Sequence, residues 1–553
     1  MMTTDTTLTV TKRPLADLIA SRLLALGIHD LFAIPGDFVL PWLSRFEQQS
    51  SLTLVQLSHE PSAVFAADAA ARYTNRPAAV VLTYGAGALN AINAVAQAYM
   101  EFVPLLVFAG FPSTRELDAG YLLHHQTADV DGQLRMLSEV TALQVRLDNP
   151  ATAVAQFELA LATCQRESRP VLIELPRDMA MCGVPEIPSV VHEATTCAEN
   201  SDRIQRLDEA RCAVTSYLQK ASKPCALVGA KARRFGFADA VMALSRRCQL
   251  TCVTTLLGRG VVSKSQCLFG GTFTGAKGDP LADFLLNSDL LLLCGVIHSD
   301  SNFAGYPTLL SDRPVLWWDE HGLRLPDGRF FPLTVADSTE LFATIDLPFT
   351  PRLGELAPSC APAESPKAWS SGLVMQQLHK QLTLRSELYP FVVDIGDCLF
   401  ASLQVAPEYL LAPAFYASMG YAVPAALGLQ QVCKLRPIVV VGDGAFQMTG
   451  LELGHCSRFG WTPIVIVLNN QSWGMIKAFA PDLQATSLSG WNYAALARAM
   501  NGGSRQVWNV EQFVSAIDDA LADTQRFRLI EVMLPADSYS ECLARFSGAM
   551  TTA

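Results

Sequence analysis

Residues 439–477 read VVVGDGAFQMTGLELGHCSRFGWTPIVIVLNNQSWGMIK. A β-branched run ends at the Gly-Asp-Gly turn 442–444, a helix-compatible segment follows, and a second apolar run, 464–468, ends at the Asn pair 469–470. This order predicts a strand, a turn, a helix and a second strand, which is one βαβ unit of a parallel sheet. The stretch therefore indicates an open α/β fold.

Two polar side chains follow the two strands of this unit. Asp443 comes after the first strand and Asn470 after the second, so both are expected at the carboxyl edge, where open α/β sheets bind ligands. A carboxylate and an amide oxygen beside the start of a helix suit Mg²⁺ that bridges a diphosphate. A Gly-Asp-Gly turn alone is common. Combined with the Asn pair at this spacing, it is a specific signal for such a site.

Buried apolar runs that end near a glycine recur along the chain. We expect strands at residues 30–35, 78–83, 104–109, 224–229, 251–255, 290–295 and 391–394. The first three run into turns at Gly36, Gly85 and Gly110, and helical patterns separate the runs. This alternation predicts doubly wound parallel sheets. The predicted fold class is α/β, with three consecutive open domains and mostly parallel sheets.

Two segments without periodicity are predicted to be linkers. Residues 185–202 are polar, and residues 349–369 are rich in Pro, Ala and Ser. They divide the chain into predicted domains 1–190, 191–360 and 361–553, each of a size typical of α/β domains.

The composition restricts the class of protein. Half of the 553 residues are apolar and 17% are charged, which indicates a well-buried globular chain. A net charge of −11 argues against nucleic acid and anionic membranes as partners, but leaves an anionic small molecule open. The 14 cysteines show no zinc-ligand spacing, so we expect reduced and mostly buried thiols. Without a signal-peptide core or a long apolar run, the expected location is the cytoplasm.

Four further motifs accompany the Gly-Asp-Gly turn and the Asn pair. They are IPGD at 34–37, HE at 59–60, GYLLHHQ at 120–126 and SMG at 418–420. Together they resemble, over essentially the whole chain, the pyruvate, indolepyruvate and phenylpyruvate decarboxylases that depend on thiamine diphosphate (ThDP). The His pair after Leu-Leu is the most specific motif, because related ThDP synthases and ligases generally lack it. The resemblance implies ThDP and Mg²⁺ as cofactors, with pyrimidine-binding, middle and diphosphate-binding domains in that order.

The resemblance assigns catalytic roles in the first domain. Glu60 is expected to begin a helix, where the helix dipole alone favours glutamate, so its residue type leaves its role open. The family pattern implies that Glu60 hydrogen-bonds the aminopyrimidine ring of ThDP. It also implies that Asp37, His124 and His125 orient the substrate and exchange protons with it. Adjacent residues of an extended segment point to opposite sides, so we expect at most one histidine to face the ligand directly.

The remaining cofactor contacts are implied for the third domain. The residues assigned to cofactor binding are Glu60, Asp397, Ala417, Met419, Gly442, Asp443, Gly444, Ala445, Asn470 and Met475. Those assigned to Mg²⁺ are Asp443, Asn470 and Ser472. By resemblance, Met419 supports the bent cofactor and the Ala417 backbone holds its amino group, although a methionine is also a common packing residue.

Two positions depart from the pyruvate decarboxylase pattern. A glutamate that follows the Asn pair in pyruvate and indolepyruvate decarboxylases is replaced here by apolar Met475 or Ile476, as in the phenylpyruvate decarboxylase branch. A tryptophan that fills the pocket of pyruvate-specific members is replaced by Leu399. We therefore expect a substrate pocket of Leu399, Met475, Ile476 and Phe479, with room for a phenyl or indole ring.

The predicted activity is ThDP- and Mg²⁺-dependent decarboxylation of phenylpyruvate, indole-3-pyruvate or both, giving the aldehyde and CO₂. In the family, Glu60 and the Gly-Asp-Gly site belong to different subunits, which implies a homodimer, commonly paired into a homotetramer. Three other functions are alternatives to this activity. The His pair argues against a ThDP carboligase or synthase, and the absence of G-x-G-x-x-G after a strand argues against a nucleotide-binding oxidoreductase. The missing glutamate motivates the third, a non-catalytic paralogue.

Overall fold

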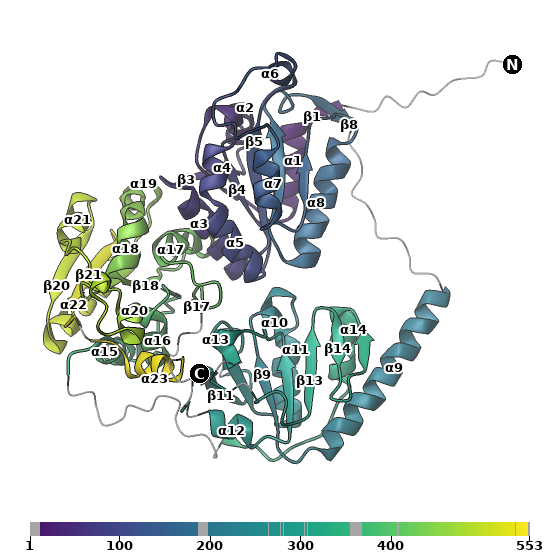
Figure 1. Cartoon of the computed structure of the whole chain (residues 1–553), viewed down its shortest axis with the longest axis vertical. Helices are drawn as coiled ribbons and strands as arrows, with labels where there is room; N and C mark the ends of the chain where they lie inside the picture. Colours follow the sequence, from purple (N-terminus) through teal and green to yellow (C-terminus); the bar gives the residue numbers. More distant parts are fainter. Residues whose placement is uncertain are drawn as a thin grey trace. The chain divides into compact units, whose positions relative to one another are not determined.

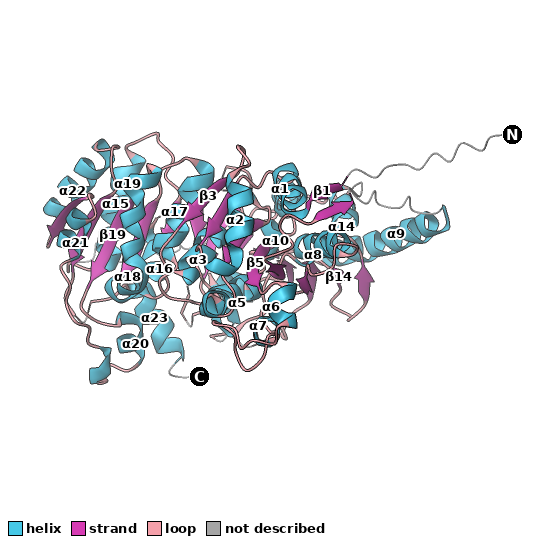
Figure 2. Cartoon of the chain, turned by 90° about the horizontal axis from the view of Figure 1, so that it is seen from above, coloured by secondary structure: helices cyan, strands magenta, loops and turns pink. Residues whose placement is uncertain are grey.

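The computed structural model describes residues 12–185, 197–353 and 368–550, apart from positions 264, 277, 280, 304, 307, 406, 408 and 537. The chain divides into two compact units, Met1–Glu193 (the first unit) and Ala194–Ala553 (the second unit). The first unit contains one large sheet and the second contains two (Figure 1). Helices flank the mostly parallel strands (Figure 2), so the predicted fold class is confirmed.

The first unit is built on a six-stranded parallel sheet of order β3-β2-β4-β5-β7-β6. Its strands are β2 (Asp30–Ala33), β3 (Thr53–Gln56), β4 (Ala78–Leu82), β5 (Leu105–Phe111), β6 (Gln144–Arg146) and β7 (Val171–Pro176), and a separate antiparallel pair is formed by β1 (Lys12–Pro14) and β8 (Gly183–Pro185). Its helices are α1 (Leu15–Ala25), α2 (Leu40–Glu47), α3 (Glu60–Thr74), α4 (Ala86–Asn90), α5 (Ile92–Met100), α6 (Thr114–Asp118), α7 (Gly132–Ser138) and α8 (Ala153–Glu167), with the 3₁₀ turn η1 (Asp37–Val39). One apolar core joins α1, α2 and α8 to the sheet, and α3 packs on β2 and β4.

One predicted turn in this sheet is wrong. Strand β5 does not end at Gly110 but continues to Phe111. A Cβ atom on Gly110 would lie 2.8 Å from the Cβ of Phe38, so this glycine allows η1 to approach the strand closely. Close packing, and not a turn, explains the glycine.

The second unit contains a seven-stranded and a six-stranded sheet. The order of the first is β11-β10-β9-β12-β13-β14-β15, and the order of the second is β17-β16-β18-β19-β21-β20. The strands of the first are β9 (Pro224–Val228), β10 (Cys252–Thr255), β11 (Phe269–Phe273), β12 (Leu290–Cys294), β13 (Val315–Asp319), β14 (Gly322–Arg324) and β15 (Phe330–Pro332). Those of the second are β16 (Phe391–Val393), β17 (Leu410–Leu411), β18 (Ile438–Gly442), β19 (Ile464–Asn469), β20 (Gly503–Val507) and β21 (Arg528–Met533). Only β14 introduces antiparallel pairing into these two sheets among the described residues.

Helices cover both sheets of the second unit. Around the seven-stranded sheet they are α9 (Cys197–Lys220), α10 (Lys231–Arg234), α11 (Ala238–Cys248), α12 (Ala282–Leu286), α13 (Asp300–Phe303) and α14 (Val335–Ala343). Around the six-stranded sheet they are α15 (Ser371–Thr383), α16 (Asp397–Ala401), α17 (Ala422–Cys433), α18 (Asp443–Thr449), α19 (Cys456–Phe459), α20 (Gly474–Phe479), α21 (Tyr493–Ala499), α22 (Val510–Ala522) and α23 (Glu541–Met550). Arg259, which follows β10, links the part of the second unit around the seven-stranded sheet to the part around the six-stranded sheet. Its guanidinium donates to the carbonyls of Ser402 and Val405, both at 2.9 Å.

The predicted linkers fall partly outside the described residues, which exclude 186–196 and 354–367. The first prediction extends too far, because α9 already begins at Cys197 instead of after residue 202. Residues 197–202 read as polar linker sequence, yet they form the start of this long helix.

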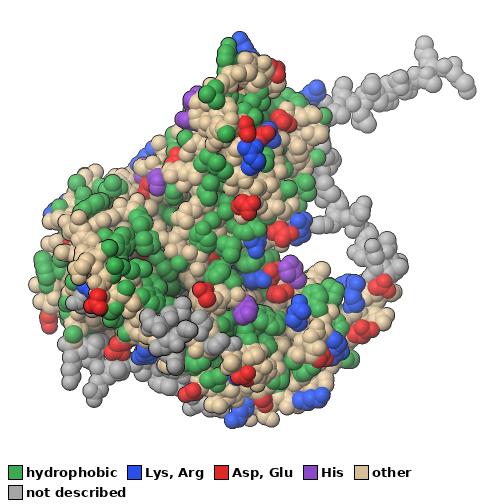
Figure 3. All heavy atoms as spheres, viewed as in Figure 1, with side chains coloured by type: hydrophobic (Ala, Val, Ile, Leu, Met, Phe, Trp, Pro, Cys, Tyr) green, Lys and Arg blue, Asp and Glu red, His purple; other side chains and the backbone are tan. Residues whose placement is uncertain are grey.

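Two expectations from composition can be compared with the structure. The described cysteines are all free, and all except Cys182, Cys212 and Cys433 are buried, as predicted. Within the described ranges, no helix has both the length and the apolar character needed to cross a membrane. Figure 3 shows acidic and basic side chains interspersed on the visible face.

Candidate active site

The Gly-Asp-Gly turn and the Asn pair lie at the carboxyl ends of neighbouring strands. Strand β18 ends at Gly442 and pairs in parallel with β19, with Gly442 opposite Leu468. Asp443 then begins α18, and Asn470 follows the last residue of β19. The structure thus brings Asp443 and Asn470 to one edge of the sheet, as the strand pattern predicts.

The Asp443 carboxyl group is buried in this edge. Its Oδ1 accepts from the backbone N–H of Gly444 at 2.9 Å, and its Oδ2 accepts from that of Gln471 at 2.6 Å. Burial raises the pKa of Asp443 to about 6, against these hydrogen bonds, which favour the ionised form. The backbone N–H of Ser472 donates to Asn470 Oδ1 at 3.1 Å, while the Ser472 hydroxyl donates to the Thr486 carbonyl at 3.2 Å.

A cavity of about 320 Å³ opens at this edge within the second unit. Most residues expected to bind the cofactor, the metal or the substrate line it: Asp397, Leu399, Ala417, Met419, Gly442, Asp443, Gly444, Ala445, Asn470, Ser472, Met475 and Ile476. Glu60 belongs to the first unit. Phe479 is not part of the lining, and its ring lies 6.3 Å from that of Phe546, which does line the cavity.

The walls of the cavity are largely apolar. Leu399 is 1% exposed, and Met475 and Ile476 come from α20. A Cβ on Gly444 would lie 2.3 Å from the Trp473 indole, so this position requires glycine for the indole to pack against the turn. Apolar walls strengthen the electrostatic effect of the few polar groups among them once a ligand displaces the water.

Asp397 is fastened into the wall of the cavity. Its carboxylate accepts from the hydroxyls of Ser371 and Ser540, and from the backbone N–H of Ser540 at 3.0 Å. Burial raises the pKa of Asp397, although these hydrogen bonds oppose the rise. Asp397, the first residue of α16, thus connects that helix to the start of α15 and to the residue before α23.

Asp394 is a functional candidate that the sequence analysis missed. It is fully buried at the end of β16 and accepts from the backbone N–H groups of Gly420 (3.1 Å) and Ala422 (2.8 Å). Burial raises the pKa of Asp394 to about 6. These bonds fix the segment with Met419 and Ala417, whose φ of 66° is left-handed. An acidic residue directly after an apolar strand was the available signal.

The residues around the cavity fit a diphosphate cofactor held by a divalent cation. Carboxylate and amide oxygens are the ligands that Mg²⁺ prefers, and Asp443 and Asn470 supply one of each. A cation there would offset the cost of burying the Asp443 carboxylate. A Cβ on Gly442 would meet no atom closer than Cys398 Sγ at 3.9 Å, so the turn leaves space for a ligand.

In the first unit, Glu60 is the first residue of α3. Its Oε2 accepts from Asn90 Nδ2 at 2.7 Å. Its Oε1 lies beside Gly87, where a Cβ would come within 3.3 Å of that oxygen. Helix α4 therefore positions the carboxylate.

Asp37, His124 and His125 come together in the same unit. His124 Nε2 lies 3.0 Å from Asp37 Oδ2, and one polar side-chain atom of each of the three residues lies within 4.8 Å of the others. The prediction of an extended segment is wrong here, because the two histidines form a turn in which His125 has a left-handed φ of 67°. This turn lets both imidazoles face Asp37, whereas an extended segment would separate them.

Arg177 joins this cluster and was not predicted. Its Nη2 lies 3.5 Å from Asp37 Oδ2 and 3.1 Å from Glu116 Oε1, and its guanidinium lies 4.3 Å from the centre of the Phe38 ring. Arg177 directly follows β7, so the carboxyl end of a strand was again the signal. The Arg177 guanidinium therefore partly neutralises the Asp37 carboxylate at the oxygen that also contacts His124.

Known proteins resemble this chain over nearly its full length. Residues 13–135, 212–318 and 394–532 match the N-terminal TPP binding domain, the central domain and the C-terminal TPP binding domain of thiamine pyrophosphate enzymes. The chain is 36% identical to an indole-3-pyruvate decarboxylase of Azospirillum brasilense, over 96% of this chain and 97% of that protein. It is 27% identical to a probable pyruvate decarboxylase of Schizosaccharomyces pombe (97% and 96%) and to pyruvate decarboxylase 2 of Arabidopsis thaliana (99% and 93%).

Proposed function

Because this chain belongs to the ThDP-dependent 2-keto acid decarboxylases, which are carboxy-lyases, we propose that its substrates are aromatic 2-keto acids. Phenylpyruvate or indole-3-pyruvate would lose CO₂ and leave as the aldehyde. The observation that carries this choice is Leu399 in the cavity wall, beside Met475 and Ile476, where a bulky indole would reduce the space. The similarity to the indole-3-pyruvate decarboxylase of Azospirillum brasilense also supports an aromatic substrate.

The second unit would bind the cofactors. Asp443, Asn470 and Ser472 would hold Mg²⁺, and Met419, which also lines the cavity, would support ThDP. ThDP supplies the carbon nucleophile that this decarboxylation requires. The apolar lining would exclude water and favour a step in which charge is dispersed.

The first unit would handle protons. Asp37 Oδ2 and His124 Nε2 lie at hydrogen-bonding distance, so a proton can be held between them and passed on. Glu60, oriented by Asn90, would hydrogen-bond the aminopyrimidine. We further propose a homodimer in which Glu60 of one subunit completes the cofactor site of the other, with dimers paired into tetramers.

The test measures aldehyde formed from phenylpyruvate, indole-3-pyruvate and pyruvate, with and without ThDP and Mg²⁺. We expect cofactor-dependent turnover with kcat/KM for an aromatic acid at least about tenfold above that for pyruvate. Leu399→Trp should reverse this preference by filling the cavity, whereas Leu384→Trp, at a leucine that is 78% exposed, should not. A higher kcat/KM for pyruvate in the unmodified enzyme would refute the aromatic assignment, and acyloin products would favour a carboligase.

A further inference from the structure

We propose that Gln133 is a positioning residue of the active site, which acts on His125 and Glu60 through the backbone of Gly85. The proposal rests on the roles proposed above for the His pair and Glu60. Gln133 lies in α7 and is 1% exposed, so it cannot contact a substrate itself.

Both ends of the Gln133 amide are engaged. Its Oε1 accepts from the backbone N–H of Gly85 at 2.7 Å, and its Nε2 donates to Glu174 Oε1 at 2.9 Å. A side-chain amide that donates at one end and accepts at the other has only one orientation that satisfies both partners. The amide therefore forms a rigid link between β7 and the turn after β4.

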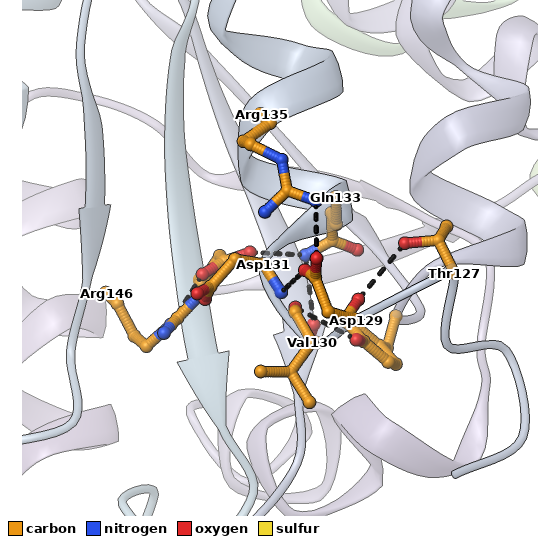
Figure 4. A network of polar contacts seen from close by, with 10 residues as sticks. Thr127, Asp129, Val130, Asp131, Gln133, Arg135 and Arg146 are labelled. Carbon is orange, nitrogen blue, oxygen red and sulfur yellow. Dashed lines mark hydrogen bonds and ion pairs between the residues drawn. The ribbon is translucent and has the colours of Figure 1, made fainter. Parts of the chain in front are cut away.

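A network of charges holds the far end of this link (Figure 4). Arg146 donates to Glu174 Oε2 and to Asp131 Oδ1, both at 2.7 Å. Asp129 accepts from the backbone N–H of Asp131 at 2.9 Å and from Arg135 Nη2 at 2.8 Å. The network thus ties the segment that begins at residue 127, directly after the His-His-Gln motif, to the sheet.

The near end of the link touches the two groups expected to act in catalysis. Gly85 has a φ of 57°, and a Cβ on it would lie 1.8 Å from the carbonyl oxygen of His125. Gly85 is the N-cap of α4, and Gly87 in that helix lies against Glu60 Oε1. If Gly85 moves, the His125 backbone and the Glu60 carboxylate lose a fixed neighbour together.

Loss of the Gln133 amide would leave buried groups without partners. The Gly85 N–H and Glu174 Oε1 would both need new ones, because unsatisfied buried polar groups are costly. To recover a partner the turn would have to shift, and its backbone at Gly85 lies directly against the His125 carbonyl. This displacement is the physical basis of the proposed role.

The first test compares Gln133→Leu with Gln144→Leu. Gln144 is a matched control, because it is a half-buried glutamine of the same unit whose amide donates to Thr141, away from the proposed site. We expect Gln133→Leu to lower kcat by about 10- to 100-fold with little change in KM, and Gln144→Leu to keep the original kcat. The affinity for ThDP and Mg²⁺, measured by calorimetry, should change by less than about twofold, because no cofactor ligand is displaced.

A second measurement is independent of turnover. The rates at which diethyl pyrocarbonate modifies His124 and His125, followed by peptide mass spectrometry, should change in Gln133→Leu and not in Gln144→Leu. If the unmodified protein does not decarboxylate keto acids, the proposed function fails, but this measurement still tests Gln133. Unchanged kcat together with unchanged modification rates would overturn the proposal.

The variant Gln133→Glu separates positioning from general loss of stability. Two carboxyl groups would then face each other and share a proton at low pH, whereas both ionise and repel at higher pH. The other groups facing them are Arg146 from β6, Asp131 from the loop before α7 and Tyr84 from the turn after β4. Burial already raises the pKa of Glu174, against the Arg146 charge.

We therefore expect kcat of Gln133→Glu, relative to the unmodified enzyme, to fall at least about fivefold as pH rises from about 5.5 to about 8. The deficit of Gln133→Leu should not depend on pH. Circular dichroism at each pH reports the folded fraction. A deficit that disappears when kcat is corrected for that fraction would show a merely structural role and contradict the proposal.

Discussion

Asp443 and Asp394 are two buried carboxyl groups of the second unit that meet mainly backbone N–H donors. Burial raises both pKa values to about 6. The Asp394 carboxylate accepts hydrogen bonds from the backbone of Gly420 and Ala422 and so fixes the part of the cavity wall that contains Met419. Asp443 lies at the strand edge beside Asn470, where a divalent cation can bind. A buried aspartate therefore orders the backbone at position 394 and offers a cation ligand at position 443.

Cofactor binding should depend on pH through Asp443. A carboxyl group with a pKa of about 6 must lose its proton to bind Mg²⁺, so the affinity should fall by about tenfold per pH unit below pH 6. Calorimetric titration of ThDP and Mg²⁺ between about pH 5 and pH 8 measures this slope. Asp443→Asn should bind more weakly and with little pH dependence. A flat profile for the unmodified protein would be inconsistent with this role.

The same shift affects the cofactor-free protein in the opposite sense. An aspartate pKa raised from 3.8 to about 6 by folding means that the folded chain binds more protons between these values. The contribution of Asp443 to the free energy of unfolding therefore decreases as pH rises through this window and is constant above it. Low pH favours the empty fold and weakens cofactor binding.

At the level of elements, the strands were the most predictable part. Buried parallel strands are apolar runs between glycine turns, so the predicted ranges match β4, β9 and β12 to within a residue. The turn at His124-His125 was not predictable, because it depends on Gly85, which is distant in sequence. Asp394 and Gln133 were missed for a related reason, because their partners are distant in sequence. Asp394 binds the backbone N–H groups of Gly420 and Ala422, and Gln133 binds the Gly85 N–H and the Glu174 carboxylate.

Helix α3 carries Glu60 and depends on a buried ion cluster. Arg72 Nε lies 2.5 Å from Asp68 Oδ1 in the same helix, and its Nη1 lies 2.8 Å from Glu101 Oε2, just after α5. All three side chains are at most 1% exposed. One guanidinium therefore joins the two helices by neutralising carboxylates on each side.

Arg72→Met should destabilise the first unit strongly. It removes the guanidinium that pairs with two buried carboxylates, so the free energy of unfolding should fall by about 3–5 kcal/mol, as measured by urea denaturation. Arg166→Met removes only an exposed ion pair with Glu167, and should cost less than about 1 kcal/mol. Adding Asp68→Asn and Glu101→Gln to Arg72→Met should recover part of the loss. A loss below about 1 kcal/mol for Arg72→Met would contradict the role of the cluster.

For the whole molecule, the groups expected to act on one substrate belong to different compact units. Glu60, Asp37 and the His pair are in the first unit, and the cavity with Asp443 is in the second. If two subunits share each site, as proposed, a dimer has two sites, each assembled from both chains. In a heterodimer of one chain altered at Glu60 and one altered at Asp443, one site would then contain both altered residues and the other site neither.

Mixed dimers test this arrangement. Glu60→Gln and Asp443→Ala should each be inactive, the first in catalysis and the second in cofactor binding. Heterodimers isolated after co-expression with two different tags should regain about half of the activity per dimer, because one site receives both intact residues. Each tagged homodimer, purified in the same way, is the control. Inactive heterodimers would place Glu60 and Asp443 of one chain in the same site.

The packing of Trp473 against Gly444 has a practical consequence. The indole lines the cavity beside the Gly-Asp-Gly turn, so a bound ligand would change the polarity around it and could stack on it. Tryptophan fluorescence is sensitive to such changes. Trp473 is therefore an intrinsic fluorescent reporter in the wall of the cavity. Its emission can be used to follow the rate of cofactor binding before any substrate is added.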